Sequence, residues 1–370
     1  MKKILSVSFF VTTLIVQSCC TTNTNIIPKK ADANAVKEYL NERINQPFDR
    51  TQTLPVVFAT NRRIVSGTSV PKCSNSYFSP NFNEGTSYGV CDISVPMKHE
   101  IGTLDSNQDG DSNQYFKFTD FTPITSTQWI EKVKNSKHDE VILFVHGFNV
   151  LFEEAVLRAA QMKYDLKFPG EIVLYTWPAG PTGGIFEKLN INGTYKANQQ
   201  NAKGTIPMVK QILRDISSTG KKVHVIVHSM GHQIVLPAIS ELSKEKPDSF
   251  IEELILNAPD FPTTEFHSIK GNLKKASKRI TVYCSPGDKA LVASRQVNEN
   301  ERIGSCEKIS GVDMINVNEV DDSLIGLNHG YYSSRQILTD LYQLLLGVDA
   351  QRRLFIRNSP SSKEDYILRK

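Results

Sequence analysis

The stretch KVHVIVHSMGHQIVL, residues 222–236, decides the fold. Its first half alternates apolar residues and ends in the run Val225–Val227, which predicts a buried strand. After a turn it continues with the apolar spacing of a helix as far as Ile239. A serine between a buried strand and a helix, with a glycine two residues later, is the layout of a nucleophile elbow, which would lift the Ser229 hydroxyl out of the sheet beside a helix N-terminus. The same triplet also occurs in ordinary strand–turn–helix joints, so the rest of the chain has to decide.

From residue 140 onward, apolar strands alternate with helical patterns, which is typical of a mostly parallel sheet covered by helices on both faces. We expect strands at residues 141–145, 172–177, 222–227, 254–256, 280–284 and 314–317. We expect helices at residues 152–166, 202–216, 265–275, 288–297 and 333–345. The predicted fold class is therefore α/β.

Upstream of residue 140 the pattern is different. Short alternating segments at residues 54–59, 88–95 and 115–118 predict strands. Residues 65–90 are rich in Ser, Gly, Asn and Pro, and most of this stretch is expected to be loop. These segments predict an N-terminal β-rich addition to the α/β part.

Residues 1–19 have the layout of a bacterial lipoprotein signal peptide. Two lysines precede an apolar stretch, residues 4–16, which is short for a membrane span. The following residues resemble a lipobox, in which a cysteine after a small residue is acylated and becomes the mature N-terminus. We therefore expect lipidation at Cys19, with Cys20 as an alternative register, and a protein anchored to a membrane of the cell envelope. Plain secretion and an uncleaved anchor are the alternatives.

The remaining four cysteines permit disulfides in an exported chain. The simplest of the three connectivities pairs Cys73 with Cys91 and Cys284 with Cys306. No Cys/His spacing suggests zinc, so no metal is expected. The formal net charge of +4 includes two lysines of the signal segment, and no basic run is interleaved with aromatic residues. The composition therefore gives no reason to expect a nucleic-acid partner.

The segment His146–Asn149 leaves the first strand of the α/β part. A His-Gly dipeptide in this loop can present a backbone N–H to an oxyanion. We assign the N–H of Phe148 to that role and pair it with the N–H of Met230, next to the serine. A strand-ending His-Gly is otherwise a simple turn, but its position two strand–helix units before the elbow favours the functional interpretation.

Two acids follow strands beyond the elbow. Asp288 comes after the second of these strands, in the loop Ser285–Asp288, where the carboxylate of a catalytic triad belongs. Asp260 follows the first of them and competes for the same role. We favour Asp288, because a helix is expected to begin near Thr263 and Asp260 would serve as its cap.

A histidine in the last loop completes the pattern. His329 follows the last predicted strand, from where it can reach back over Ser229 as a general base. His228 and His232 flank the serine, but their place on the elbow itself is wrong for accepting its proton. The chain order Ser229, Asp288, His329 is that of α/β-hydrolases and of neither serine protease class.

Seven segments of the chain resemble an α/β-hydrolase family of unknown function, found mainly in bacteria and often labelled esterase/lipase superfamily. They are FVHGFN, RAAQMKYDL, FPGEIVLYTWP, VIVHSMGHQIVL, LNAPDF, VYCSPGDKALVASRQV and NHGYY. The resemblance covers residues 53–347 and implies a serine hydrolase fold with Ser229, Asp288 and His329 in the triad. Family members usually have a small residue at the position of Val227, so this valine is expected to strain or loosen the elbow.

These observations predict a division of the chain into a signal peptide at residues 1–19, a tether with a short helix at 20–49, one α/β-hydrolase domain at 50–348 and a C-terminal tail at 349–370. The tail is charged and expected at the surface.

The expected activity is hydrolysis of carboxylic esters, of small molecules or lipids, through an acyl-enzyme and without a cofactor. The loop from Trp177 to Tyr195 is the expected wall of the acyl pocket, with Trp177 and Phe186 as apolar lining or, equally, as core residues. Two other functions fit the sequence: acyl transfer by the same triad, and a non-catalytic, surface-anchored interaction protein on a hydrolase scaffold.

Overall fold

The structure is a computed structural model that describes residues 52–67, 70–181, 191–320 and 329–370. The predicted signal peptide with Cys19 and Cys20, the short helix of the tether, and Phe186 lie outside the described residues.

Eleven strands of the described residues form one sheet, in the order β10-β11-β9-β8-β7-β6-β4-β5-β1-β2-β3. Neighbouring strands from β1 through β5, β4, β6, β7, β8 and β9 to β11 are parallel, and β2, β3 and β10 are antiparallel additions at the two edges. The strands are β1 (Gln52–Ile64), β2 (Phe78–Val95), β3 (Lys117–Ile124), β4 (Glu140–Val145), β5 (Glu171–Thr176), β6 (Lys222–His228), β7 (Ile251–Asn257), β8 (Ser277–Cys284), β9 (Asp313–Asn316), β10 (Ile356–Asn358) and β11 (Tyr366–Leu368).

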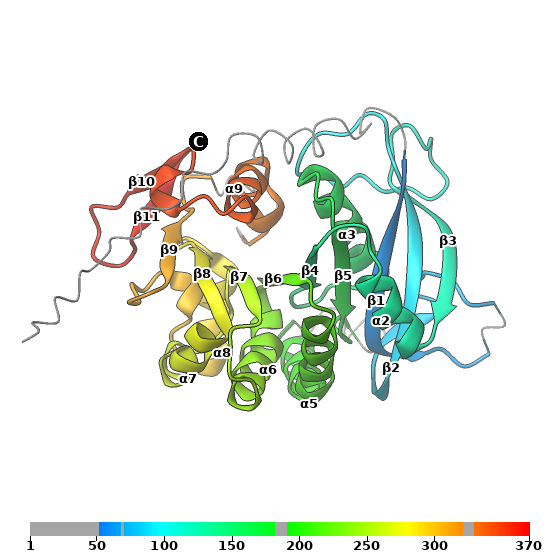
Figure 1. The fold of residues 1–370 in the computed structure, drawn as a ribbon, viewed down its shortest axis with the longest axis horizontal. Helices are drawn as coiled ribbons and strands as arrows, with labels where there is room; N and C mark the ends of the chain where they lie inside the picture. The colour runs from blue at the N-terminus through cyan, green and yellow to red at the C-terminus, as the bar shows by residue number, and fades with distance from the viewer. Residues whose placement is uncertain (1–51, 68–69, 182–190, 321–328) are drawn as a thin grey trace, which may run out of the picture. The chain divides into compact units, whose positions relative to one another are not determined.

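Helices cover both faces of the sheet (Figure 1). Helices α2, α5, α6 and α7 pack on one face, and α3 and α9 pack on the other. The helices are α2 (Ser126–Lys134), α3 (Phe152–Asp165), α5 (Ile191–Ser218), α6 (His232–Glu245), α7 (Thr263–Ala276), α8 (Lys289–Asn298) and α9 (Arg335–Leu345). The predicted α/β class, with a mostly parallel sheet and helices on both faces, is confirmed.

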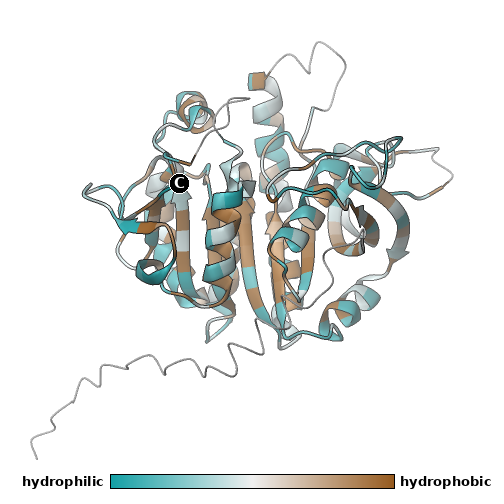
Figure 2. Ribbon diagram, turned by 90° about the horizontal axis from the view of Figure 1, so that it is seen from above, coloured by the Kyte–Doolittle hydropathy of each residue, from teal (hydrophilic) through white to brown (hydrophobic). Residues whose placement is uncertain are grey.

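The core lies along the central strands because both of their faces are covered. Hydrophobic residues concentrate in these strands, whereas the helices carry hydrophilic residues on their outer surfaces (Figure 2). Strand β4 has five fully buried residues in succession, Val141–Val145, as expected for a parallel strand between two helical layers. Because β4, β6, β7 and β8 are parallel neighbours, their carboxyl ends lie together at one end of the sheet. The loops that carry the predicted site residues start there.

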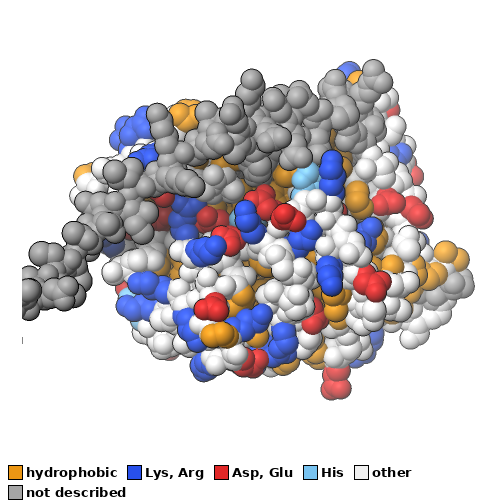
Figure 3. All heavy atoms as spheres, in the orientation of Figure 1, with side chains coloured by type: hydrophobic (Ala, Val, Ile, Leu, Met, Phe, Trp, Pro, Cys, Tyr) orange, Lys and Arg blue, Asp and Glu red, His pale blue; other side chains and the backbone are white. Residues whose placement is uncertain are grey.

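The outer surface carries charges of both signs. Lys and Arg side chains alternate with Asp and Glu over the face shown in Figure 3. Lys210 of α5, for example, pairs with Glu245 of α6 at 2.8 Å. Among the described residues, no helix is both long and apolar enough to cross a membrane.

The N-terminal part differs from expectation in one respect. Strand β2 begins at Phe78, inside the stretch 65–90 that was expected to be mostly loop. It continues the ladder with β1 past two register shifts, as far as the pair Ile64 and Phe78. Its polar residues lie on a half-exposed surface, which is why their composition resembles a loop, whereas Phe78 is buried and stacks on Phe152 of α3 with ring centroids 4.3 Å apart. The β-rich addition is thus part of the main sheet.

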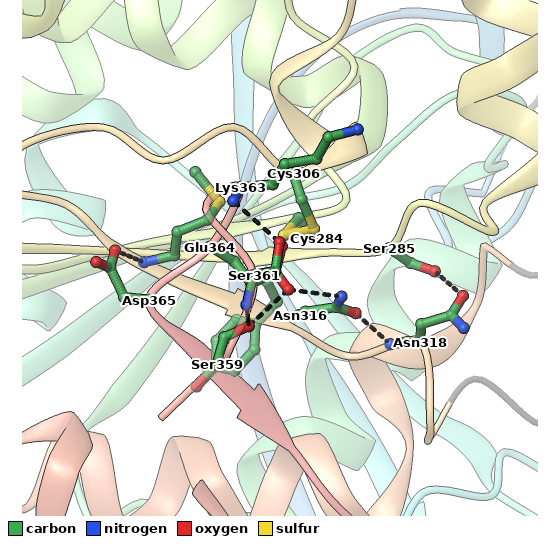
Figure 4. Close-up of a disulfide and its surroundings, with 12 residues drawn as sticks. Cys284, Ser285, Cys306, Asn316, Asn318, Ser359, Ser361, Lys363, Glu364 and Asp365 are labelled. Atoms are coloured by element: carbon green, nitrogen blue, oxygen red, sulfur yellow. Dashed lines mark hydrogen bonds between the residues drawn. A yellow bond between two sulfur atoms is a disulfide. The ribbon is translucent and has the colours of Figure 1, made fainter. Parts of the chain in front are cut away.

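Residues 349–370 are mostly exposed, as expected of a charged surface segment, but they extend the sheet and do not form an irregular tail. Strands β10 and β11 extend the sheet beyond β9. The buried Arg353 pairs with Asp340 of α9 at 2.8 Å. The buried Glu364 accepts hydrogen bonds from Ser359 at 2.8 Å and from Asn316 of β9 at 3.4 Å (Figure 4). Charged residues that look like tail in the sequence therefore find buried partners, which a composition argument could not reveal.

Candidate active site

Ser229 lies at a sharp turn between β6 and α6. Its φ is +52°, in the left-handed region that L-residues rarely adopt. Such a strained backbone position is typical of functional turns. A Cβ on Gly231 would lie 2.6 Å from the carbonyl oxygen of His146, so only glycine fits where the turn crosses the end of β4. The local geometry is that of a nucleophile elbow.

Val227, the residue that we expect to strain or loosen the elbow, is fully buried beneath this turn. It pairs with Val145 on β4 and with Leu256 on β7 in the ladder. Its Cγ1 would lie 3.2 Å from a Cβ on Gly231, so the valine fills the space next to the turn that glycine leaves free.

Three side chains from distant parts of the chain meet at this turn. The Nε2 of His329 lies 2.6 Å from the Oγ of Ser229. The Nδ1 of the same ring lies 2.6 Å from the Oδ2 of Asp288. Because an ionised carboxylate only accepts, Nδ1 carries the proton and Nε2 is free to accept the serine hydroxyl. The structure thus brings together the three residues that the sequence singled out, in a single hydrogen-bonded relay.

The relay runs from a nearly buried serine to a fully buried acid. Ser229 is 4% exposed, the His329 side chain 19% and the Asp288 side chain 0%. The second oxygen of Asp288, Oδ1, accepts the backbone N–H of Leu291 at 3.1 Å and so caps helix α8. Both carboxylate oxygens are therefore engaged, and the start of α8 fixes the acid in its direction towards His329.

The competing acid, Asp260, has other partners. It is buried, and it accepts hydrogen bonds from the Tyr195 hydroxyl at 2.7 Å and the Ser294 hydroxyl at 2.5 Å. The Arg302 Nε lies 3.2 Å from its Oδ1. Burial, and then the negative charge of Asp260, raise the pKa of Tyr195 to about 12.

The prediction that Asp260 caps the helix near Thr263 is wrong. The N-cap of α7 is Pro262, which has no side chain able to accept a hydrogen bond. The carboxylate of Asp260 instead faces α5 and α8, where it meets Tyr195 and Ser294. The capping role that we expected of Asp260 belongs in the structure to Asp288.

The loop after β4 lies directly against the serine. A Cβ on Gly147 would lie 2.7 Å from the Cβ of Ser229 and 2.8 Å from the Nδ1 of His228, so the loop approaches as closely as a backbone can. Phe148, the next residue, lines the same cavity as Ser229, and Asn149 turns the chain away with a φ of +59°. Met230 follows Ser229 in the turn and is fully buried. The peptide N–H groups of Phe148 and Met230, which are expected to hold an oxyanion, thus belong to two segments that meet at Ser229.

His146 supports this loop from below. It is buried, and burial followed by the positive charge of Arg62 lowers its pKa to about 3, so the ring stays neutral. It stacks on Trp177 with ring centroids 5.5 Å apart, and the Trp177 Nε1 donates to the His146 carbonyl at 2.8 Å. Trp177 is fully buried and belongs to the hydrophobic core, which is the second of the two roles left open for it.

Sequence reasoning gave Arg62 no role of its own. Its buried guanidinium donates to Thr176 at 3.0 Å, to the Ala179 carbonyl at 2.9 Å and to the Val150 carbonyl at 2.8 Å. Burial lowers the pKa of Arg62 to about 9. It ties the loop after β4 to the loop after β5. The only signal in the sequence is the charged residue at the end of an apolar strand, which does not identify its partners.

The two histidines of the elbow hold the relay rather than join it. The Nε2 of His228 donates to the backbone carbonyl of His329 at 3.1 Å, and its ring stacks on Tyr332 at a centroid distance of 3.8 Å. The Nδ1 of His232 donates to the backbone carbonyl of Ser229 at 2.6 Å. A carbonyl only accepts, so each contacting nitrogen carries the proton. Burial lowers the pKa of His232 to about 3 and that of His228 well below its ordinary value.

The cysteines form two disulfides, Cys73–Cys91 and Cys284–Cys306, with Cα atoms 6.1 Å and 5.2 Å apart. These are the two local pairs that the spacing favoured. The second disulfide lies at the end of β8, where the loop to Asp288 begins (Figure 4). The N–H of Ser285 donates to the Gly304 carbonyl at 3.0 Å beside it. The crosslink therefore fixes the base of the loop that carries the acid.

A cavity of about 110 Å³ opens at Ser229 and His329. Its other lining residues are Phe148, Ile191, Asn192, Tyr195, Asp260, Ala290, Leu291, Ala293, Ser294 and Val297. Within the described part of the chain, no group of three or more His, Cys, Asp or Glu side chains is placed to hold a metal ion.

Comparison with curated proteins gives no match. Among solved structures, the chain is similar to a hyperthermophilic esterase from the archaeon Pyrobaculum calidifontis, with 12% identity, a TM-score of 0.33 and coverage of 85% of this chain and 94% of that chain. A monoclinic form of the Pyrobaculum calidifontis esterase has 12% identity, a TM-score of 0.31 and the same coverage. The family model described as alpha/beta hydrolase of unknown function (DUF900) matches residues 123–348, which is more than half of the chain. The chain belongs to this α/β-hydrolase family.

Proposed function

We propose that this protein is a serine hydrolase that cleaves carboxylic esters through an acyl-enzyme. The observation that carries the proposal is the relay from Ser229 through His329 to Asp288, with both hydrogen bonds at 2.6 Å. A serine activated by an adjacent base, itself oriented by a third group, is the arrangement that nucleophilic catalysis needs.

In the first half-reaction, the Oγ of Ser229 forms a bond to the ester carbonyl carbon while His329 Nε2 takes the hydroxyl proton. Asp288 keeps the ring in the required tautomer and stabilises the imidazolium. The N–H groups of Phe148 and Met230 hold the oxyanion of the tetrahedral intermediate. His329 then gives the proton to the leaving alkoxide oxygen as the bond between it and the carbonyl carbon breaks.

In the second half-reaction, water attacks the acyl carbon on Ser229. His329 takes a proton from this water and returns it to the Oγ of Ser229 as the acid leaves, so the enzyme is regenerated. Every proton and bond is accounted for by the serine, the histidine, the ester and one water.

The test combines covalent labelling with turnover. The full chain should react with a fluorophosphonate probe and hydrolyse p-nitrophenyl acetate, and Ser229→Ala should do neither while melting like the parent. Ser243→Ala, which changes a buried serine on α6 away from the relay, is the matched control and should keep both activities. Labelling that persists in Ser229→Ala would contradict the proposed nucleophile.

We further propose that the protein is a lipoprotein held on a membrane by acylation of Cys19, on the basis of the lipobox-like end of the signal segment. Cells expressing the chain should incorporate labelled palmitate into it, and Cys19→Ala should not incorporate it. Incorporation that is lost in Cys20→Ala but kept in Cys19→Ala would move the anchor by one residue, and none in any variant would favour simple secretion.

A further inference from the structure

The cavity at Ser229 is a short cleft between helices α5 and α8. Tyr195 of α5 is buried in its floor, and Ile191, one turn earlier, is exposed at its rim. On the α8 side, Ala290, Ala293 and Val297 follow one another at helical spacing. The cleft holds about 110 Å³, less than the cavity of about 150 Å³ that binds one benzene molecule in an engineered protein core.

The floor of the cleft is closed by hydrogen bonds. Asp260 accepts from Tyr195 and Ser294 and faces the buried Arg302 at 3.2 Å. The Tyr195 hydroxyl in turn accepts the Asn298 amide at 3.1 Å. The carboxylate of Asp260 also accepts the Gln233 amide at 3.4 Å, and removing the partner of a buried charge is strongly destabilising. A ligand therefore cannot lengthen the cleft by pushing into its floor.

The walls are apolar and small. Two alanines and Val297 on α8 face the site together with Phe148 and Ile191. Apolar walls around a few polar groups fit a hydrocarbon chain, since a polar chain would lose its hydrogen bonds to water without replacement. The two alanines leave this space open, and a larger side chain at either position can reach into it.

We propose that the substrates are esters with a short acyl group, of about two to four carbons, bound in this cleft. The inference rests on the proposed function. The acyl part stays on Ser229 after the alcohol has left. An alcohol held in a cleft with a closed floor would have to leave past the acyl group still attached to the serine. The cleft therefore suits the acyl part, and the alcohol lies on the open side.

The experiment compares p-nitrophenyl acetate, butyrate, hexanoate and octanoate by kcat/KM on the full chain. The parent should prefer acetate or butyrate to octanoate by at least about tenfold, since a single methylene in an apolar pocket changes kcat/KM by about 10-fold or more. Ala293→Leu should lower kcat/KM for butyrate at least about tenfold relative to acetate. Val297→Ala should shift the preference towards hexanoate.

Val292→Leu is the matched control, because Val292 lies next to Ala293 on α8 and does not line the cleft. It should leave the chain-length profile unchanged. A second series, acetate esters of alcohols from methyl to octyl, should show a much weaker dependence on alcohol length.

Three results would overturn the inference while ester turnover and probe labelling remain: octanoate hydrolysed as well as butyrate, equal profiles for the parent and both cleft variants, or a length limit in the alcohol series instead. Absence of both turnover and fluorophosphonate labelling would instead reject the proposed function, and the inference with it.

Discussion

Asp260 and Asp288 follow neighbouring parallel strands, β7 and β8, and both carboxylates are buried, yet their surroundings are opposite. Asp288 faces His329, a ring partly open to solvent, and its other oxygen caps α8. Asp260 is enclosed by Tyr195, Ser294 and Arg302 and has no hydrogen bond to the histidine. Asp288 is thus held by the start of one helix and by one histidine, whereas Asp260 is held by an ion pair and two hydroxyl groups.

The difference shows what selects an acid for a role at a strand end. Both side chains leave the same end of the sheet, but Asp288 is the last residue before helix α8, whose first turn donates a backbone N–H to one of its oxygens. Asp260 stands two residues before Pro262, which caps α7 without a side-chain hydrogen bond. The carboxylate of Asp260 is therefore free to turn into the interior, where Arg302 offsets the cost of burying its charge.

The largest effect is expected from Asp288→Asn. An amide cannot stabilise the imidazolium and allows the wrong tautomer of His329, so ester turnover should fall by a factor on the order of 10⁴. Asparagine keeps an oxygen that can accept the Leu291 N–H, so melting should change little. Steady-state kinetics and thermal denaturation of the same preparation test both halves. A loss of less than about tenfold would mean that Asp288 is not the acid.

Asp260→Asn should have the reverse profile. Turnover should stay within a few-fold of the parent, while the free energy of unfolding falls by about 3–5 kcal/mol, because the buried Arg302 loses its carboxylate. Glu301→Gln is the matched control: Glu301 pairs with Arg295 at the surface at 3.1 Å, and its loss should cost under about 1 kcal/mol. Denaturant titration measures both. If Asp260→Asn loses turnover and Asp288→Asn does not, the two roles are exchanged.

Sequence pattern could predict the central strands and the order of the site residues, because each signal there is local. The apolar run at Val141–Val145, the turn at Ser229 and the loops carrying Asp288 and His329 each follow from a few adjacent residues. The first part of strand β2, residues 78–87, and the strands β10 and β11 could not be predicted in this way. They pair at the sheet edges, where one face is polar, so the apolar alternation that marks a strand is weak.

The contacts that support the site could not be predicted from the sequence either, because they join residues that are far apart along the chain. The contacts of Arg62 with Thr176 and Val150, and of Asp260 with Arg302, join residues whose proximity only the fold creates. Helix α5 begins at Ile191, well before the expected residue 202, since its polar first turns read as loop. Tyr195 lines the cleft, as expected of the segment 177–195, but it lies on a helix and not on a loop.

A moderate effect, visible only through pH, is expected from the buried histidines. The folded-state pKa of His232 is lowered to about 3, below its ordinary 6.5, so the unfolded chain binds a proton in that interval that the folded chain does not. Stability should therefore fall as pH drops from about 6.5 towards 3, by about 1.4 kcal/mol per pH unit for each such histidine. His232→Gln should reduce the slope of unfolding free energy against pH by about one proton. An unchanged slope in urea titrations from pH 7 to pH 4 would show that His232 titrates alike in both states.

The smallest effect is expected at Val227, an apolar residue that makes no hydrogen bond with Asp260 or Asp288. Its substitution tests whether packing beneath Ser229 matters as much as the hydrogen bonds around the serine. Its side chain is fully buried between Val145 and Leu256 in the ladder, beside the space kept free by Gly231. Val227→Ala removes two methyl groups from a packed site, which is destabilising, and relieves crowding at a turn where Ser229 already has a φ of +52°, which is stabilising. These terms oppose each other, so the free energy of unfolding should change by no more than about 1.5 kcal/mol in either direction, and ester turnover should be equal or higher.

Parallel measurements of kcat and the denaturant midpoint of Val227→Ala test this prediction. A collapse of turnover with an unchanged midpoint would mean that the valine is required to hold the serine, so that packing, and not only the partners of Asp288 and His329, determines the geometry of the relay.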